Sequence, residues 1–141
     1  MRLPIGSLLR PRGMVVTVTM VVAALLLWRG ESARRASEVG QVADWVREAV
    51  RQARAGGDEP MRLGDSEPVV ASAFGAWVRS SAPEGTAGDA GVRAEALGSR
   101  SGDGAGTHRV EVTVGGRRAE LRVEWADGGS PPRAVAFTEV R

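Results

Sequence analysis

The sequence predicts an α+β protein in which an N-terminal transmembrane helix precedes one or two helices packed on a three- or four-stranded antiparallel β-meander. Three observations support this fold class. Met14–Trp28 is an uncharged apolar run, Glu38–Ala53 has apolar residues at helical spacing, and apolar residues alternate with polar ones on both sides of Gly115 and Gly116. With 141 residues, the chain has room for one modest core.

The apolar run Met14–Trp28 is expected to be a membrane anchor, which we place at residues 14–29. Its fifteen residues carry no charge and are bounded by Arg12 and Arg29. An α-helix of this length covers about 22 Å, against a hydrocarbon core of about 30 Å. The run therefore spans a bilayer only if the flanking arginines snorkel to the interface or the bilayer thins.

Two other interpretations of this run remain open. Its length and basic flank also fit a cleavable signal peptide, although small residues occupy both cleavage positions only at Gly30 and Ser32. A buried core helix is disfavoured, because arginine bounds both ends of the run and the run has no polar face. An uncleaved anchor is the preferred interpretation.

The charge distribution suggests an orientation and excludes one class of partner. The first 29 residues hold four arginines and no acid, whereas fifteen arginines and seventeen acids follow. The domain at residues 30–141 is therefore nearly neutral, unlike a nucleic-acid binder. The basic tail at residues 1–13 is expected in the cytoplasm and the domain outside it, although Arg34 and Arg35 nearly balance the tail.

The segment Glu38–Ala53 is predicted to be an amphipathic helix. Gly56 and Gly57 follow it and are expected to end it. Whether it continues from the anchor through Gly30 and Gly40 is left open, because glycine weakens a helix. Its apolar stripe is the candidate docking surface for another protein and consists of Val39, Val42, Val46 and Val50.

A second helix is predicted at Pro68–Arg79, with Asp65 or Ser66 as its N-cap. Val69–Phe74 is also compatible with a strand. We expect a turn-rich connection at Ala82–Gly91 and a flexible glycine-rich loop at Gly98–Thr107.

A β-hairpin is predicted around the turn formed by Gly115 and Gly116. A two-residue turn fixes the register, which pairs Val112 with Ala119, Val110 with Leu121, Glu111 with Glu120 and Arg109 with Arg122. Leu121, Val123 and Trp125 are then expected on the core face. A weaker strand near Val92–Leu97 and a final strand at Arg133–Val140 complete the meander.

The sequence offers no pattern typical of an active site, and we predict no enzyme, no cofactor and no metal or small-molecule site. A phosphate-binding P-loop requires lysine, and the chain has no lysine and no cysteine. His108, the only histidine, is expected to be exposed at a strand end. Hairpin carboxylates such as Glu120 and Glu124 alternate with arginines, which disfavours the raised pKa of an acid catalyst. Trp45, Trp77 and Trp125 are expected in the core.

The plan of the whole chain resembles that of type IV pilins and the pseudopilins of type II secretion, with the stretch through Ala53 similar to the family's exposed half-helix and the hairpin similar to its sheet. Arg10, Pro11, Arg12 and Gly13 resemble the end of that family's basic leader, and Met14 resembles its first mature residue. The resemblance implies processing between Gly13 and Met14, and one long helix leading to an antiparallel sheet. The family's usual glutamate at the fifth mature position is replaced here by Val18.

These observations predict a non-enzymatic, single-pass membrane protein whose exterior domain binds other proteins as an accessory or assembly subunit of a cell-envelope complex. The expected partners are membrane lipid and other envelope proteins. The alternative is a pseudopilin or minor pilin-like component of a secretion or pilus system.

Overall fold

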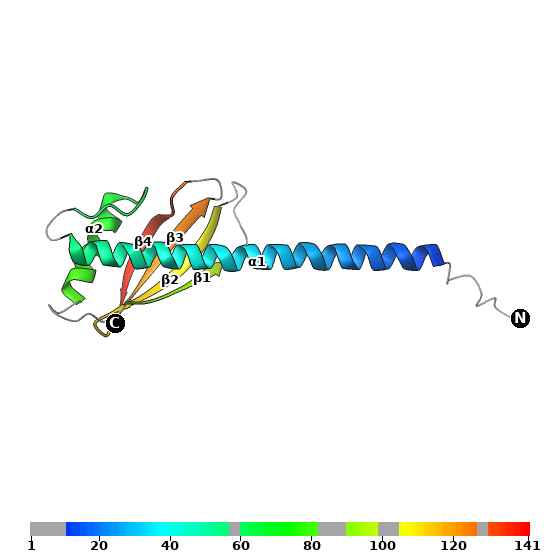
Figure 1. The fold of residues 1–141 in the computed structure, drawn as a ribbon. Coiled ribbons are helices and arrows are strands. Elements are labelled where there is room, and N and C mark those ends of the chain that lie inside the picture. Colours follow the sequence, from blue (N-terminus) through cyan, green and yellow to red (C-terminus); the bar gives the residue numbers. More distant parts are fainter. Residues whose placement is uncertain (1–10, 57–59, 82–89, 99–104, 127–129) are drawn as a thin grey trace, which may run out of the picture. The chain divides into compact units, whose positions relative to one another are not determined.

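The computed structural model describes residues 11–56, 60–81, 90–98, 105–126 and 130–141 (Figure 1). The chain divides into two compact units, Met1–Ala36 and Ser37–Arg141. The described elements are two helices, α1 (Pro11–Ala55) and α2 (Pro68–Ser81), and four strands. The predicted α+β class is confirmed.

The four strands form one antiparallel sheet in the order β1-β2-β3-β4, and Figure 1 shows them side by side. Their bounds are Gly91–Leu97 for β1, Ala105–Val114 for β2, Arg117–Ala126 for β3 and Arg133–Val140 for β4. Each strand therefore pairs with its neighbour in sequence, as predicted for a meander. The weak strand expected near Val92–Leu97 is β1, an edge of the sheet.

The central hairpin has the predicted register, with Val112 opposite Ala119 and Val110 opposite Leu121. Its turn residues Gly115 and Gly116 both have positive φ angles, 57° and 81°. Positive φ at both central positions defines the type I′ turn, which matches the twist of the flanking strands and strongly favours glycine.

Helix α1 passes through Gly30 and Gly40 without a break and ends at Ala55. Beyond it, the backbone N–H of Gly56 donates to the carbonyl of Gln52 at 2.9 Å and completes the last turn. Helix α2 occupies Pro68–Ser81, so the strand alternative for Val69–Phe74 is wrong.

The predicted N-cap of α2 is also wrong. Because the helix begins at Pro68, Glu67 precedes its first residue, and the N–H of Ala71 donates to the Glu67 carbonyl at 3.1 Å. Proline suits the first helical position, since its missing N–H has no partner there in any case. Ser66 instead accepts a hydrogen bond on its hydroxyl from the N–H of Ala134 at 2.7 Å and links this loop to β4.

One apolar cluster joins the second half of α1, helix α2 and one face of the sheet. Its largest fully buried side chains include Phe74 and Leu121. Trp77 is buried, whereas Trp45 and Trp125 are partly buried and pack against the cluster. Leu121 and Val123 therefore confirm the predicted core face of the hairpin, and Trp125 lies at its edge.

Strand β2 begins earlier than predicted, and this places His108 in the interior. Ala105, Gly106 and Thr107, expected in a loop, pair with residues of β3. His108 precedes Val110 by two residues in the extended strand and therefore shares its inward face. Only 2% of the His108 surface is exposed, so its expected exposure at a strand end is wrong. Residues 82–89 and 99–104 of the two predicted connections lie outside the described residues.

Candidate functional site

Helix α1 carries a stretch of exposed apolar side chains, Val18–Trp28. Every residue from 18 to 37 is exposed, and the large apolar side chains of the stretch are 49% to 76% exposed. They occupy helical positions 18, 20, 21, 22, 25, 26, 27 and 28, so they point in all directions around the helix axis. A soluble helix normally carries one apolar stripe, and an apolar surface on all sides is typical of a helix buried in protein or lipid.

Among the described residues, no helix is both long enough and apolar enough to cross a membrane.

The predicted processing site, Gly13 and Met14, lies in the first turn of α1, which begins at Pro11. The predicted docking stripe lies within the domain. Val42, Val46 and Val50 are at most 1% exposed and belong to the domain's own core cluster, while Val39 is half-buried. Val42, Val46 and Val50 therefore contribute to the core of the domain.

The outer face of the hairpin is a ladder of ion pairs. The Arg109 guanidinium lies 3.2 Å from the Glu95 carboxylate and 3.4 Å from that of Glu120. Arg133 donates to Glu124 at 2.8 Å, and this hydrogen bond, together with the nearby negative charge, raises the pKa of the Arg133 guanidinium. These groups are solvated, so each ion pair adds little to the stability of the domain.

Among the described residues, no group of three or more histidines or carboxylates is arranged to hold a metal ion.

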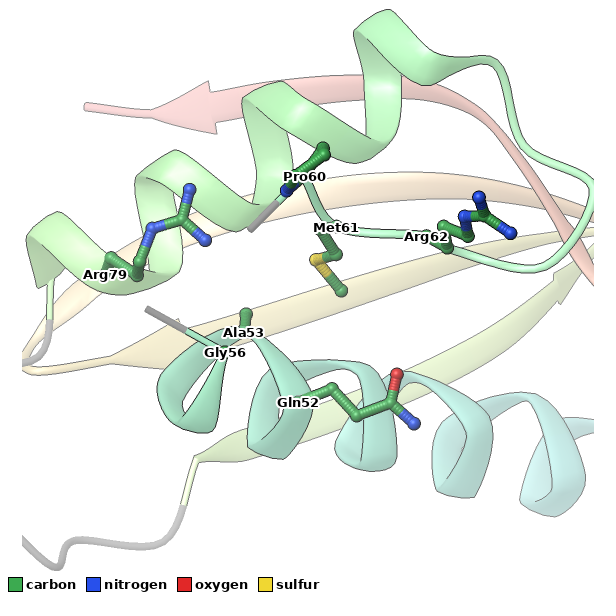
Figure 2. A pocket seen from close by; sticks show the side chains of 7 residues that line it. All are labelled: Gln52, Ala53, Gly56, Pro60, Met61, Arg62 and Arg79. Atoms are coloured by element: carbon green, nitrogen blue, oxygen red, sulfur yellow. The ribbon is translucent and has the colours of Figure 1, made fainter. Parts of the chain in front are cut away.

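A hollow of about 200 Å³ lies between the end of α1, the loop that follows it and α2. Figure 2 shows Met61 of the loop pointing between the two helices, with Arg79 on α2 and Arg62 further along the loop. The end of α1 contributes Gln52 and Ala53, and Gly56 and Pro60, which follow the helix, complete the lining. The hollow thus combines two guanidinium groups, a carboxamide and an apolar thioether.

Gly75 of α2 brings Met61 close to that helix. A Cβ atom at Gly75 would lie 3.1 Å from the Met61 sulfur and 3.4 Å from a terminal nitrogen of Arg79. A methyl group at this position would push Met61 aside by a few tenths of an ångström, so Met61 and the Arg79 guanidinium both lie close to the same turn of α2. No sequence pattern indicates this arrangement, because Met61 lies in the loop after α1 whereas Arg79 lies in α2.

A second hollow of about 210 Å³ adjoins the first and shares Pro60, Met61 and Arg62 with it. Its other walls are mostly apolar and include Leu63, Pro68 and Ala71. Typical small-molecule pockets measure about 300 to 1,000 Å³, so each hollow is closer in size to a single side chain than to a cofactor.

No family model matches the chain, and neither a curated protein nor a solved structure does so. Two features of the described structure bear on function: the exposed apolar stretch of α1 and the paired hollows around Met61.

Proposed function

We propose that this protein is a non-enzymatic, single-pass membrane protein whose extracytoplasmic domain binds other envelope proteins as an accessory or assembly subunit. The observation that carries the proposal is the apolar surface around all sides of α1 at Val18–Trp28. Exposing such a surface to water is unfavourable by roughly 25 cal/mol per Å², and lipid removes this cost. The run Met14–Trp28 is short for a span, and its flanking arginines lengthen it by snorkelling.

The arrangement of the domain supports a binding role over a catalytic one. The single histidine is buried in β2, and Glu95, Glu120 and Glu124 are engaged by arginines on a solvated face. The proposed orientation, with residues 1–13 in the cytoplasm, follows the excess of arginine over acid at the N-terminus.

Membrane fractionation tests this proposal. The full chain should stay with membranes after washing with 1 M salt and after alkaline extraction at about pH 11, because apolar contact with lipid is insensitive to both. A chain lacking Met1–Arg29 should be soluble. Release of the full chain by the alkaline wash would indicate a peripheral protein, and retention of the shortened chain would indicate a second membrane contact.

A pseudopilin or minor pilin-like component is the second candidate function. The observation that favours it is the single helix α1, which continues into the segment that packs on an antiparallel sheet. Under this proposal the mature chain begins at Met14. Mass spectrometry of the protein purified from membranes tests it, and an intact N-terminus, or one near Ala33, removes this candidate.

A further inference from the structure

We propose that the paired hollows around Met61 form a docking site for an extended protein segment that carries an acidic side chain next to an apolar one. This inference rests on the proposed function and gives its domain a binding surface. The surface is defined by Met61, Arg62 and Arg79 together with the end of α1, and is called the Met61 groove below.

The charge of the Met61 groove favours an anionic group. The guanidinium groups of Arg62 and Arg79 make no hydrogen bond or ion pair with any described residue, whereas those of Arg109, Arg117 and Arg133 each pair with a glutamate. No acid lines either hollow within the described part of the chain. The C-terminal end of α1 contributes about half a negative charge, which two guanidinium groups outweigh. A carboxylate is a geometrically suited partner, because guanidinium groups bind it through paired hydrogen bonds.

The shape of the groove favours a side chain with an apolar stem over an inorganic anion. The walls of the first hollow include the Met61 thioether and the Ala53 methyl group beside the guanidinium groups. Methylene groups of a glutamate can pack on these atoms while its carboxylate reaches Arg79 or Arg62. Methionine adapts its shape to such a partner.

The second hollow indicates which kind of side chain lies next to the acidic one in the bound segment. Its apolar walls, which include Leu63, Pro68 and Ala71, suit an aliphatic side chain. Because the two hollows adjoin at Met61, residues close together in an extended segment can occupy both. The occupant is therefore an acidic and aliphatic segment of a protein.

The methionines of the chain provide a reporter for the test. The chain has four of them, Met1, Met14, Met20 and Met61, of which only Met61 belongs to the domain. Full-length protein with ¹³C-methyl methionine is placed in phosphatidylcholine nanodiscs and titrated with the blocked peptide acetyl-Gly-Glu-Leu-Glu-Gly-amide. The Met61 methyl resonance should shift saturably with this peptide, and the peptide with glutamine in place of both glutamates should cause less than a tenth of the shift.

Matched variants distinguish binding in the Met61 groove from a general effect of the net charge of the domain. Arg62→Gln and Arg79→Gln should each raise the Kd at least fivefold, whereas Arg93→Gln removes the same charge from exposed β1 and should change it by less than twofold. Circular dichroism establishes that each variant is folded. Asp58 and Glu59 lie outside the described residues, and changing both to amides should change the Kd of the peptide by less than twofold if the occupant comes from another protein.

Several outcomes would overturn the inference. They are no Met61 shift up to 10 mM peptide, an equal effect of Arg93→Gln, a Kd at least fivefold lower when Asp58 and Glu59 are amides, an equal response to inorganic phosphate, and a peptide-free shift in phosphatidylglycerol nanodiscs. The last outcome would assign the groove to lipid. Retention of the chain in the nanodisc is read separately, so failure of peptide binding is distinguishable from failure of the proposed membrane anchor.

Discussion

Replacing Phe74 by alanine should lower the free energy of unfolding of the domain by about 3 to 5 kcal/mol. The Phe74 side chain is 0% exposed, so its whole apolar surface is lost from the core and a cavity remains. Its ring also stacks on Trp77 at a centroid distance of 6.2 Å and meets Phe137 edge-on at 6.0 Å. Each aromatic pair contributes roughly 0.5 to 1.5 kcal/mol beyond buried area, which places the cost toward the upper end of the range.

The assay is urea unfolding of Gly30–Arg141, followed by far-ultraviolet circular dichroism. This fragment contains every buried hydrophobic residue of the described chain, from Val42 to Ala134. With a denaturant slope of about 2 kcal/mol per M, a loss of about 4 kcal/mol lowers the midpoint by about 2 M. A small domain has only about 5 to 15 kcal/mol, so Phe74→Ala removes a large share of its stability.

Val69→Ala is the matched control on the same helix. Val69 is 76% exposed and alanine is the better helix former, so this change should be neutral within about 0.5 kcal/mol. If Phe74→Ala unfolds within 1 kcal/mol of the parent fragment, or if Val69→Ala costs as much as Phe74→Ala, the assignment of the α2 faces is refuted.

Three further stability changes follow from local environments and can be measured in the same urea series. Gly40→Ala should stabilise the chain by about 0.5 to 1 kcal/mol, because the position is exposed within α1 and nothing lies within 4 Å of the added methyl group; no gain would show that α1 is not helical there. Ser81→Ala should be neutral or stabilising by up to about 1 kcal/mol, because its buried hydroxyl has no hydrogen-bond partner among the described residues; a clear loss of stability would reveal one. Trp125→Ala should cost about 1 to 3 kcal/mol, less than Phe74→Ala, because the indole is only partly buried and donates to the Ser130 carbonyl at 3.0 Å. Its comparison, Glu120→Ala, should cost at most about 0.5 kcal/mol. A larger loss of stability for Glu120→Ala than for Trp125→Ala would show that the two faces of the hairpin are assigned the wrong way round.

The hairpin was the part of the fold that the sequence predicted most fully. Strict alternation defines the inward face of each strand, and a two-residue glycine turn permits only one register that keeps Val110, Val112 and Leu121 on the same side. Helix α2 was predictable for a similar reason, since Phe74, Trp77 and Val78 recur at helical spacing.

Other features depend on contacts that no local pattern encodes. The glycines before Ala105 suggest a loop, but pairing of β2 with β3 extends the strand and buries His108. The valine stripe of α1 was visible, yet periodicity shows only that a face is apolar, and in this chain the domain's own core covers Val42 and Val46. The Met61 groove arises where the end of α1, a loop and α2 meet, so its residues share no spacing in the sequence.

The most direct test of the membrane proposal is the solvent accessibility of the apolar stretch of α1. The chain has no cysteine, so Leu25→Cys and Ala76→Cys each provide a single reactive thiol. Both positions are exposed on the isolated chain, one on α1 and one on α2. The purified full-length variants are placed in phosphatidylcholine nanodiscs, which leave both faces of the bilayer open to a charged, water-soluble maleimide. We predict that Ala76→Cys reacts rapidly with or without detergent, whereas Leu25→Cys reacts only after detergent removes the bilayer. Reaction of Leu25→Cys in the nanodisc at the rate of Ala76→Cys would contradict the proposed anchor.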